Sequence, residues 1–269
     1  NLERVDVNTI VALTGDPSVH AAVSAHCARM AGVGKSERDA IVGLSALDSN
    51  SEPTNVLPNK ASIKAQIADL NTRHVRACAQ SVERFNLAGT RTTFLPWFEA
   101  AVAAGMQAGS PIGTPLTRKN LNVLGVAQDS SWSPSQDAHE MIQAGLWFAE
   151  EHRTGIRNVR NVTTWVTDNN LAFVEASVNE AANFAVFNLR NSLEFAVGEP
   201  GFAGTVESVK NTARQLLNTL VEEQTIVAWQ SLTVSLNGDV LTVSVEISPP
   251  IPVNFIPVTV YLTAASFTA

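Results

Sequence analysis

The stretch LTVSLNGDVLTVSVEI, residues Leu232 to Ile247, contains two runs in which apolar residues alternate with polar ones. Alternation with a period of two is typical of strands that are buried on one face. Between the runs stands the pair Asn237 and Gly238, a dipeptide strongly enriched in two-residue hairpin turns. The stretch therefore predicts a β-hairpin near the end of this 269-residue chain.

The region before the hairpin predicts two amphipathic helices. Apolar residues recur at helical spacing over Ser177 to Ala196 and again over Thr205 to Glu223. The glycine-rich and proline-containing segment GEPGFAG, residues 198–204, separates the two patterns. We expect a helical hairpin followed by the β-hairpin.

The region after the hairpin predicts a further strand. The segment SPPIP, residues 248–252, ends the hairpin and is expected to serve as a short flexible lead. Residues Val253 to Leu262 are then apolar at nearly every position, with Pro257 in the middle. A proline cannot donate a hydrogen bond to a sheet, so one side of this strand must be an edge or a bulge. An apolar strand on an open edge is prone to aggregate unless it pairs with another chain.

The first half of the chain alternates strand and helix patterns, which favours a largely parallel sheet with helices on both faces. We expect the fold class α/β, a mostly parallel sheet flanked by helices, followed by an α+β C-terminal region with the helical hairpin, the β-hairpin and the terminal strand. The expected division is residues 1–165 and 166–269. The predicted strands are Asn8–Leu13, Ala40–Leu44, His74–Val82, Asn122–Val126 and Thr154–Trp165, and the predicted helices are Val19–Met30, Lys60–Leu70, Pro96–Gly109 and a helix from Ser135 or Gln136 to Ala149.

Composition narrows the possible functions. Apolar residues make up 45% of the chain, enough for a sizeable core, yet no stretch approaches the roughly 20 apolar residues of a membrane span. The net charge of −7 is unevenly placed, because residues 170–269 contain 3 basic and 9 acidic side chains. Such a balance disfavours nucleic acid as a partner. We expect neither a nucleic acid nor a membrane to be bound.

Two sequence features resemble functional motifs but lack essential parts. The segment GVGKS, residues 32–36, ends like a phosphate-binding loop, but Arg29 stands where the first glycine is required. A helical pattern also precedes it and a strand pattern follows, so we interpret it as a helix-to-strand turn. Cys27 and Cys78 have no metal-ligand spacing and are expected to be buried free thiols.

No catalytic or metal motif is recognisable around the five histidines, His20, His26, His74, His139 and His152. Asp137, His139 and Glu140, with His152 further along the chain, form a conceivable metal cluster. A polar helix surface is the interpretation that we favour for the same residues. The sequence predicts no catalysis, no cofactor and no metal.

Charged residues in the second half suggest contacts with a neighbouring chain. Arg157 and Arg160 can recognise carboxylates at an interface, or they can lie on a solvated strand. Glu207, Glu222 and Glu223 can face a basic partner, or they can keep the subunit soluble before assembly. The sequence leaves these alternatives open.

The segments together resemble a known family. Residues 155–165, 174–200, the hairpin and the terminal IPVNFIPVTVYL are similar to the C-terminal region of the contractile tail sheath proteins of bacteriophages. The stretch FLPWFEAAVAAGMQAGSPIGTPLTRKNLNVLGV, residues 94–126, matches the family pattern of a small-residue helix, a proline-broken loop and a short strand. The resemblance covers nearly the whole chain, although its motifs are diffuse.

The resemblance implies a structural polymer and not an enzyme. Sheath subunits form helical strands or stacked rings around a tail tube protein, with baseplate and tail terminator proteins at the ends, in a virion tail assembled in the host cytoplasm. Chain ends act as arms that add strands to the hairpin of a neighbouring subunit. The arm would be Val253 to Leu262, through Val253, Phe255, Ile256, Val258, Val260 and Leu262, and the acceptor hairpin would use Thr233, Val234, Leu236, Val240, Leu241, Val243 and Val245.

Two other interpretations remain. The sheath of a phage-tail-like bacteriocin or of a contractile injection system would share the fold and the mechanism. A soluble α/β hydrolase or a nucleotide-binding enzyme with an unrecognised site is the alternative from a different class. Imaging of polymers separates this enzyme from both kinds of sheath.

Overall fold

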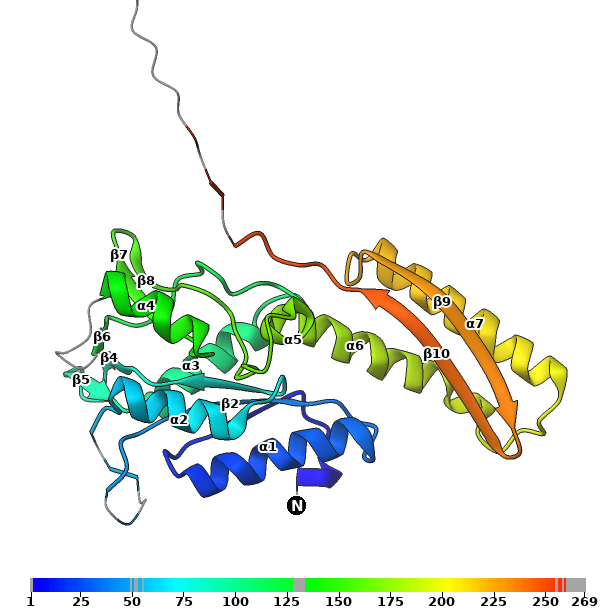
Figure 1. Cartoon of the computed structure of the whole chain (residues 1–269), viewed down its shortest axis with the longest axis horizontal. Helices are drawn as coiled ribbons and strands as arrows, with labels where there is room; N and C mark the ends of the chain where they lie inside the picture. The colour runs from blue at the N-terminus through cyan, green and yellow to red at the C-terminus, as the bar shows by residue number, and fades with distance from the viewer. Residues whose placement is uncertain are drawn as a thin grey trace, which may run out of the picture.

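The computed structural model describes residues 2–48, 50, 53–54, 56–127, 134–254, 256–257 and 259. Figure 1 shows an elongated molecule, with an α/β body at one end and a long extension that contains the C-terminal hairpin. The helices are η1 (Leu2–Arg4), α1 (Pro17–Gly32), α2 (Lys60–Leu70), α3 (Pro96–Ala108), α4 (Pro134–Gln143), α5 (Leu171–Val174), α6 (Ala176–Leu193), η2 (Glu194–Ala196) and α7 (Ala203–Glu222).

The strands form four small sheets within the described residues. The central sheet has the order β1-β2-β3 and is parallel, whereas the other three are antiparallel and have the orders β5-β4-β6, β7-β8 and β10-β9. The strands are β1 (Thr9–Ala12), β2 (Asp39–Gly43), β3 (Val75–Cys78), β4 (Ser81–Phe85), β5 (Arg91–Phe94), β6 (Gly125–Ala127), β7 (Ala149–His152), β8 (Gly155–Asn158), β9 (Ala228–Asn237) and β10 (Val240–Ser248). The α/β class expected from the sequence is confirmed.

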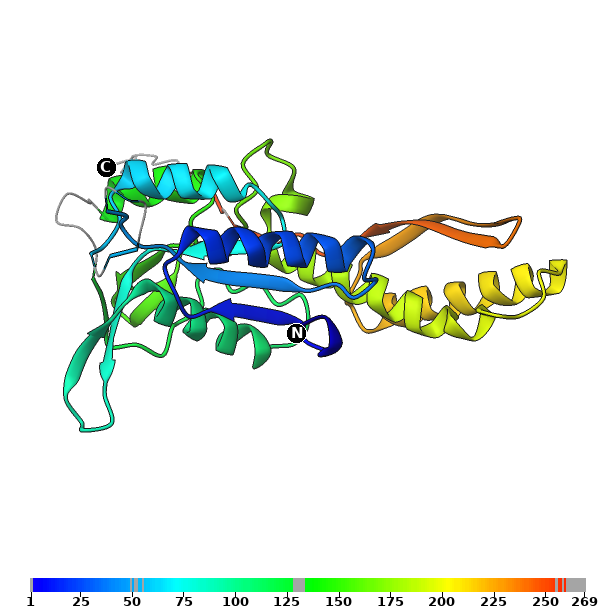
Figure 2. The ribbon, with the colours of Figure 1, turned by 90° about the horizontal axis from the view of Figure 1, so that it is seen from below.

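Helices cover both faces of the parallel sheet. All five residues of β2 are buried, as expected for a parallel strand with a core on each side. Ala40 and Val42 pack with residues of α1, α2 and α4, whereas Ile41 packs with Ala100 and Ala103 of α3. Figure 2 shows α1 and α3 on opposite sides of this sheet.

A close approach to α3 explains why β2 ends in a glycine. A Cβ added to Gly43 would lie 2.1 Å from the backbone nitrogen of Trp97, at the start of α3. Only glycine therefore lets the first turn of α3 rest directly on β2. Ala100 and Ala103, both fully buried, continue this close contact along the helix.

The predicted strand His74–Val82 is wrong as a single element. It breaks at Gln80 into β3 and β4, which belong to different sheets. The Gln80 side chain accepts from the backbone N–H of Ala149 at 2.7 Å and donates to the Ala149 carbonyl at 2.8 Å. Glu99 accepts from the Gln80 backbone N–H at 3.1 Å. These contacts from distant parts of the chain hold the bend.

The predicted helix to Ala149 is too long, because α4 ends at Gln143. Gly145 follows with φ of +89°, and the chain then runs beside β3, where the Trp147 N–H donates to the Ala77 carbonyl at 2.9 Å. The strand predicted over Thr154–Trp165 is also wrong in extent, because β8 ends at Asn158. The structure adds β5, β7 and α5, which the sequence patterns missed.

The remaining elements before residue 249 agree with the sequence to within a few residues. GVGKS connects α1 to β2, as the helix-to-strand interpretation expects. The hairpin turn is shifted by one residue, because Asn237 pairs with Val240 and leaves Gly238 and Asp239 as the turn. Gly238 has φ of +63°, which suits a glycine in the first central position of such a turn.

Candidate subunit interface

The C-terminal unit, residues 184–248, has its own apolar core. Helix α7 buries Val209, Ala213, Leu217 and Leu220, which recur every three or four residues along one face. This face packs on α6 through Ala185 and Leu189 and on the hairpin through side chains such as Trp229 and Val245. A two-stranded sheet is only marginally stable by itself, so the helix pair that covers one of its faces is needed for its stability.

The hairpin has two unlike faces. Six apolar side chains that alternate along the strands are half-buried, and their outward-facing neighbours are exposed serines, threonines and glutamate. A bulge sets Ser231 and Leu232 opposite Val245, and Ser231 has the left-handed φ of +56°. The half-buried side chains are Trp229, Leu232, Val234, Leu241, Val243 and Val245, and Ile247 extends this set at the end of β10.

Both edges of this two-stranded sheet are open within the described chain. β9 has 10 residues and β10 has 9, and Glu246 is the single charged residue in the two strands. Soluble proteins usually protect an open edge with lysines, prolines or a cover. Apart from Glu246 these strands carry no protecting charge or proline, which is typical of a sheet that accepts a further strand.

The structure places the predicted acceptor residues in two environments. Val245 packs against the core that the hairpin shares with the helix pair, and Val234, Leu241 and Val243 are half-buried, whereas Thr233 is exposed. Leu236 and Val240 flank the turn and are 37% and 58% exposed. An added strand pairs through backbone N–H and C=O groups, which requires none of these side chains. The role of these residues as acceptors therefore stays a prediction.

The predicted arm is only partly described. Phe255, Val258, Val260 and Leu262 lie outside the described residues. Among the described arm residues, Val253, Asn254, Ile256, Pro257 and Thr259 belong to no strand of their own chain. Val253 and Ile256 are about four-fifths exposed. An exposed apolar segment is therefore present on the same chain as a sheet with open edges and a single charged residue.

The two predicted interface arginines have acidic partners in their own chain. Arg157 forms an ion pair with Glu150 across the β7-β8 hairpin at 2.6 Å. Arg160 donates through Nε and Nη2 to Oε1 of Glu175, at 2.8 and 2.5 Å. Contact of either arginine with a neighbouring subunit stays a prediction.

The acidic residues of α7 lie on its exposed face. Glu207 is near the start of the helix, Glu222 is its last residue, and Glu223 caps its end. All three are exposed. They form no ion pair with a described residue, so they are available to a basic partner.

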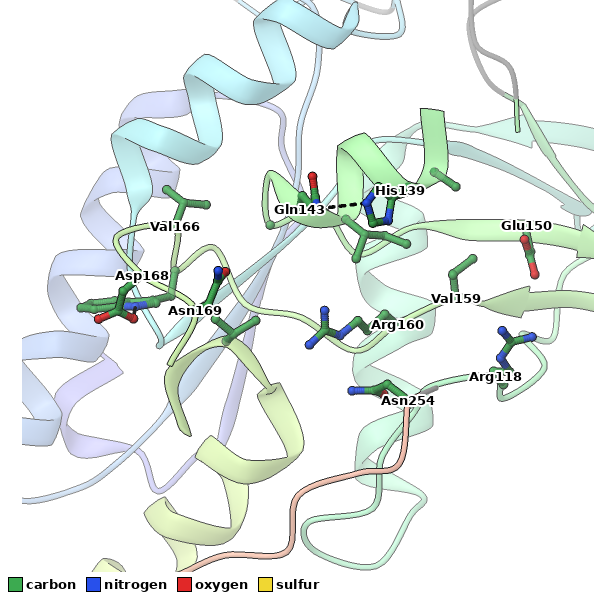
Figure 3. Close-up of a pocket in the computed structure, with 15 residues that line it drawn as sticks. Arg118, His139, Gln143, Glu150, Val159, Arg160, Val166, Asp168, Asn169 and Asn254 are labelled. Carbon is green, nitrogen blue, oxygen red and sulfur yellow. Dashed lines mark hydrogen bonds between the residues drawn. The ribbon is translucent and has the colours of Figure 1, made fainter. Parts of the chain in front are cut away.

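A pocket of about 480 Å³ lies beside the base of the arm. It is bordered by α4, by the segment 159–169 and by Asn254, and Figure 3 shows Arg118, Arg160 and Asn254 around one end of it. The Nδ2 group of Asn254 donates to Oε1 of Glu175 at 2.8 Å. The sequence patterns did not indicate this contact, because Glu175 and Asn254 are far apart in the chain and neither belongs to a motif.

The residues of the conceivable metal cluster are engaged elsewhere. Asp137 pairs with Lys60 at 2.9 Å, Glu140 pairs with Lys64, and His139 contacts Gln143 at 2.9 Å. His152 contacts the Thr154 hydroxyl at 3.1 Å. Across the described ranges, no three His, Cys, Asp or Glu side chains are close enough to share a metal ion.

Two further observations concern the cysteines and the helices. Cys27 and Cys78 are free thiols with no exposed surface, as the sequence predicts. Burial raises the pKa of the Cys27 thiol to about 12. In the described part of the chain, every helix is too short or too polar to cross a membrane.

Comparison with known proteins supports the sheath resemblance in both sequence and fold. A tail sheath protein of Bacillus phage SP01 is 29% identical over 163 residues, which are 60% of this chain and 28% of that protein. The sheath tail protein from Desulfitobacterium hafniense superposes with a TM-score of 0.70 at 17% identity, covering 92% of this chain and 54% of the other. No protein-family model matches the sequence.

A sheath solved as an assembly has the same fold. The contracted helical sheath of the anti-feeding prophage matches with a TM-score of 0.67 at 14% identity, over 97% of this chain and 71% of that one. The chain spans about half the length of the Desulfitobacterium sheath protein and less than a third of the phage SP01 protein. The resemblance to the contractile tail sheath family that the sequence indicated is confirmed.

Proposed function

We propose that this chain is a structural subunit of a contractile phage tail sheath, which polymerises around an inner tail tube and contracts to drive the tube through the host envelope. The observation that supports the proposal most directly is the pairing of features on one chain. A hairpin with open edges and a single charged residue is complementary to an exposed apolar segment, and the segment has no strand partner among the described residues.

Strand exchange explains how such a subunit forms a polymer. When the arm of one copy adds to the hairpin of the next, the contact is head-to-tail and need not close, so it generates filaments or stacked rings. Each added hydrogen bond contributes about 0.5–1.5 kcal/mol, and burial of the apolar arm residues adds to this. The partners would be further copies of the chain, a tail tube protein, and baseplate and tail terminator proteins, in a virion tail assembled in the host cytoplasm.

The role is structural and not enzymatic. The candidate site is a surface of backbone edges and apolar side chains, which supplies no reacting group. A division of labour between residues 1–165 and 166–269 belongs to the same proposal, with the hairpin and the arm in the second part. The sheath of a bacteriocin or injection particle remains the second candidate, because the anti-feeding prophage sheath shares the fold.

Deletion of Val253 to Ala269 tests the proposal. The body and the C-terminal unit bury their cores without these residues, so the truncated protein should keep its circular dichroism spectrum and its thermal midpoint. Electron microscopy should show tubes or rings for the full chain and none for the truncated one. Unchanged polymers from the truncated protein would refute the arm, and a compact monomeric full chain with hydrolase activity would favour the enzyme.

A further inference from the structure

The structure assigns a positioning role to Asn254, Glu175 and Arg160, which we call the clasp. We infer that the clasp holds the start of the arm on its own subunit, so that the part given to a second copy begins at Phe255. This inference rests on the proposed strand exchange. The inference concerns the position and direction of the arm where it leaves its own subunit. It does not concern which surface of the second copy accepts the arm.

The path of the chain after the hairpin is the first observation. β10 ends at Ser248, whose carbonyl accepts from the Val227 N–H at 2.8 Å. From there the chain continues in the direction of β10, past the end of the hairpin and toward the body (Figure 1). Pro249, Pro250 and Pro252 restrict the backbone over this stretch, because each fixes its own φ. The lead SPPIP is thus stiffer than the flexible tether that the sequence suggested, and it is held at both ends.

The far end of this stretch is held by a buried carboxylate. Glu175 has no exposed surface, and its Oε1 accepts from Arg160 and from Asn254 Nδ2, the latter at 2.8 Å. The backbone of Glu175 joins α5 to α6, and its N–H donates to the Leu171 carbonyl at 3.1 Å. The acceptor is therefore fixed by two helices and an arginine, which makes it a firm anchor for the arm.

The exposure pattern of the anchored stretch agrees with this assignment. Pro252 and Asn254 are half-buried against the body, whereas Ile251 and Val253 are 57% and 79% exposed. Alternate residues of an extended segment point in opposite directions. Holding Asn254 thus turns Ile251 and Val253 away from their own subunit, toward whatever covers them in the assembly.

The clasp can be tested by exchanging the amide of Asn254 and the carboxylate of Glu175 between the two positions. Asn254→Asp places a second carboxylate beside Glu175 and should release the segment through like-charge repulsion. The double variant Glu175→Gln and Asn254→Asp restores one amide and one carboxylate, with Arg160 still balanced by a single negative charge, and should bind the segment again. Ile251→Thr changes an exposed residue of the same stretch and leaves both polar groups in place, so it is the matched control.

The measurement is the distance between two spin labels in the full chain. One label replaces exposed Val253 in every variant, and the other replaces exposed Asp69 at the end of α2, while the buried native cysteines stay unlabelled. The wild type and the control should give a narrow distance distribution, Asn254→Asp a distribution broadened severalfold, and the double variant a narrow one. Thermal midpoints show that each variant is folded.

The outcomes for the clasp and for the strand exchange are separable. A narrow distribution for Asn254→Asp, or a broad one for the double variant, would overturn the clasp irrespective of polymer formation. Polymerisation of the protein that lacks Val253 to Ala269 would overturn the strand exchange irrespective of the distances.

Discussion

Glu99 is a carboxylic acid with no exposed surface in the middle of the body. Burial raises its pKa well above that of a free glutamate, and the hydrogen bond from the Gln80 N–H opposes this only in part. The Glu99 side chain also stabilises the bend between β3 and β4, because it accepts the hydrogen bond of the Gln80 N–H at the point where the two strands separate. One buried residue thus sets both a local geometry and a pH dependence.

We predict that the stability of the protein falls as the pH rises because of Glu99. The folded state binds the Glu99 proton more tightly than the unfolded state, so the contribution is complete below the unfolded pKa of about 4.3. It is lost as the pH rises through the raised folded pKa. Glu99→Gln keeps a hydrogen-bond acceptor without a charge and should remove this dependence. Urea unfolding from pH 5 to 9 measures it.

Glu99→Ala is the companion to that experiment. It removes the acceptor and leaves the Gln80 N–H buried and unpaired, which should cost about 1–3 kcal/mol of unfolding free energy relative to Glu99→Gln at every pH. An equal slope of stability against pH in the wild type and in Glu99→Gln would show that Glu99 titrates normally in the folded protein.

The edge of the hairpin is the element on which the proposed strand exchange depends. Thr242 is exposed on the outer face of β10 and pairs with Ser235 of β9. Thr242→Lys should leave the hairpin folded, since the side chain already lies in solvent, and should discourage an added strand through the charge. We expect far fewer and shorter polymers in sedimentation and electron microscopy, with the thermal midpoint within a few degrees of the wild type.

Gln215→Lys is the matched control, because Gln215 is exposed on α7 of the same unit and contributes no sheet edge. It should polymerise like the wild type. Equal loss of polymers in both variants would mean that added charge alone blocks assembly, and equal retention would mean that the edge of β10 is not used.

Helices and strands with a clear hydrophobic periodicity were predictable from the sequence. The points at which one element ends and the next begins were not. The hairpin and α7 show clear alternation or helical spacing, because one face of each meets an apolar core. The break at Gln80 depends on Ala149 and Glu99, which are distant in sequence, so no local pattern indicates it. The clasp was missed for the same reason, since Asn254 finds Glu175 only through the fold.

At the scale of the whole molecule, α6 joins the two ends. Its first half is buried in the body, where Asn179 and Asn183 both donate to Oδ1 of Asp39, at 3.0 and 3.1 Å. Arg190 forms an ion pair with Glu37, and the second half of the helix carries the C-terminal unit. A continuous helix with polar contacts at its base should transmit a displacement of the hairpin to the body. In this account a pull on an exchanged arm therefore moves the whole subunit.

The arm and the hairpin of different copies are the central contact of this account. An electron cryomicroscopy map of the assembled protein tests it most directly, because it shows which chain pairs with each edge. We predict that residues after Asn254 run as an added strand along β9 or β10 of a second copy. A map in which these residues fold back onto their own subunit, with both hairpin edges free of any neighbouring chain, would contradict the account.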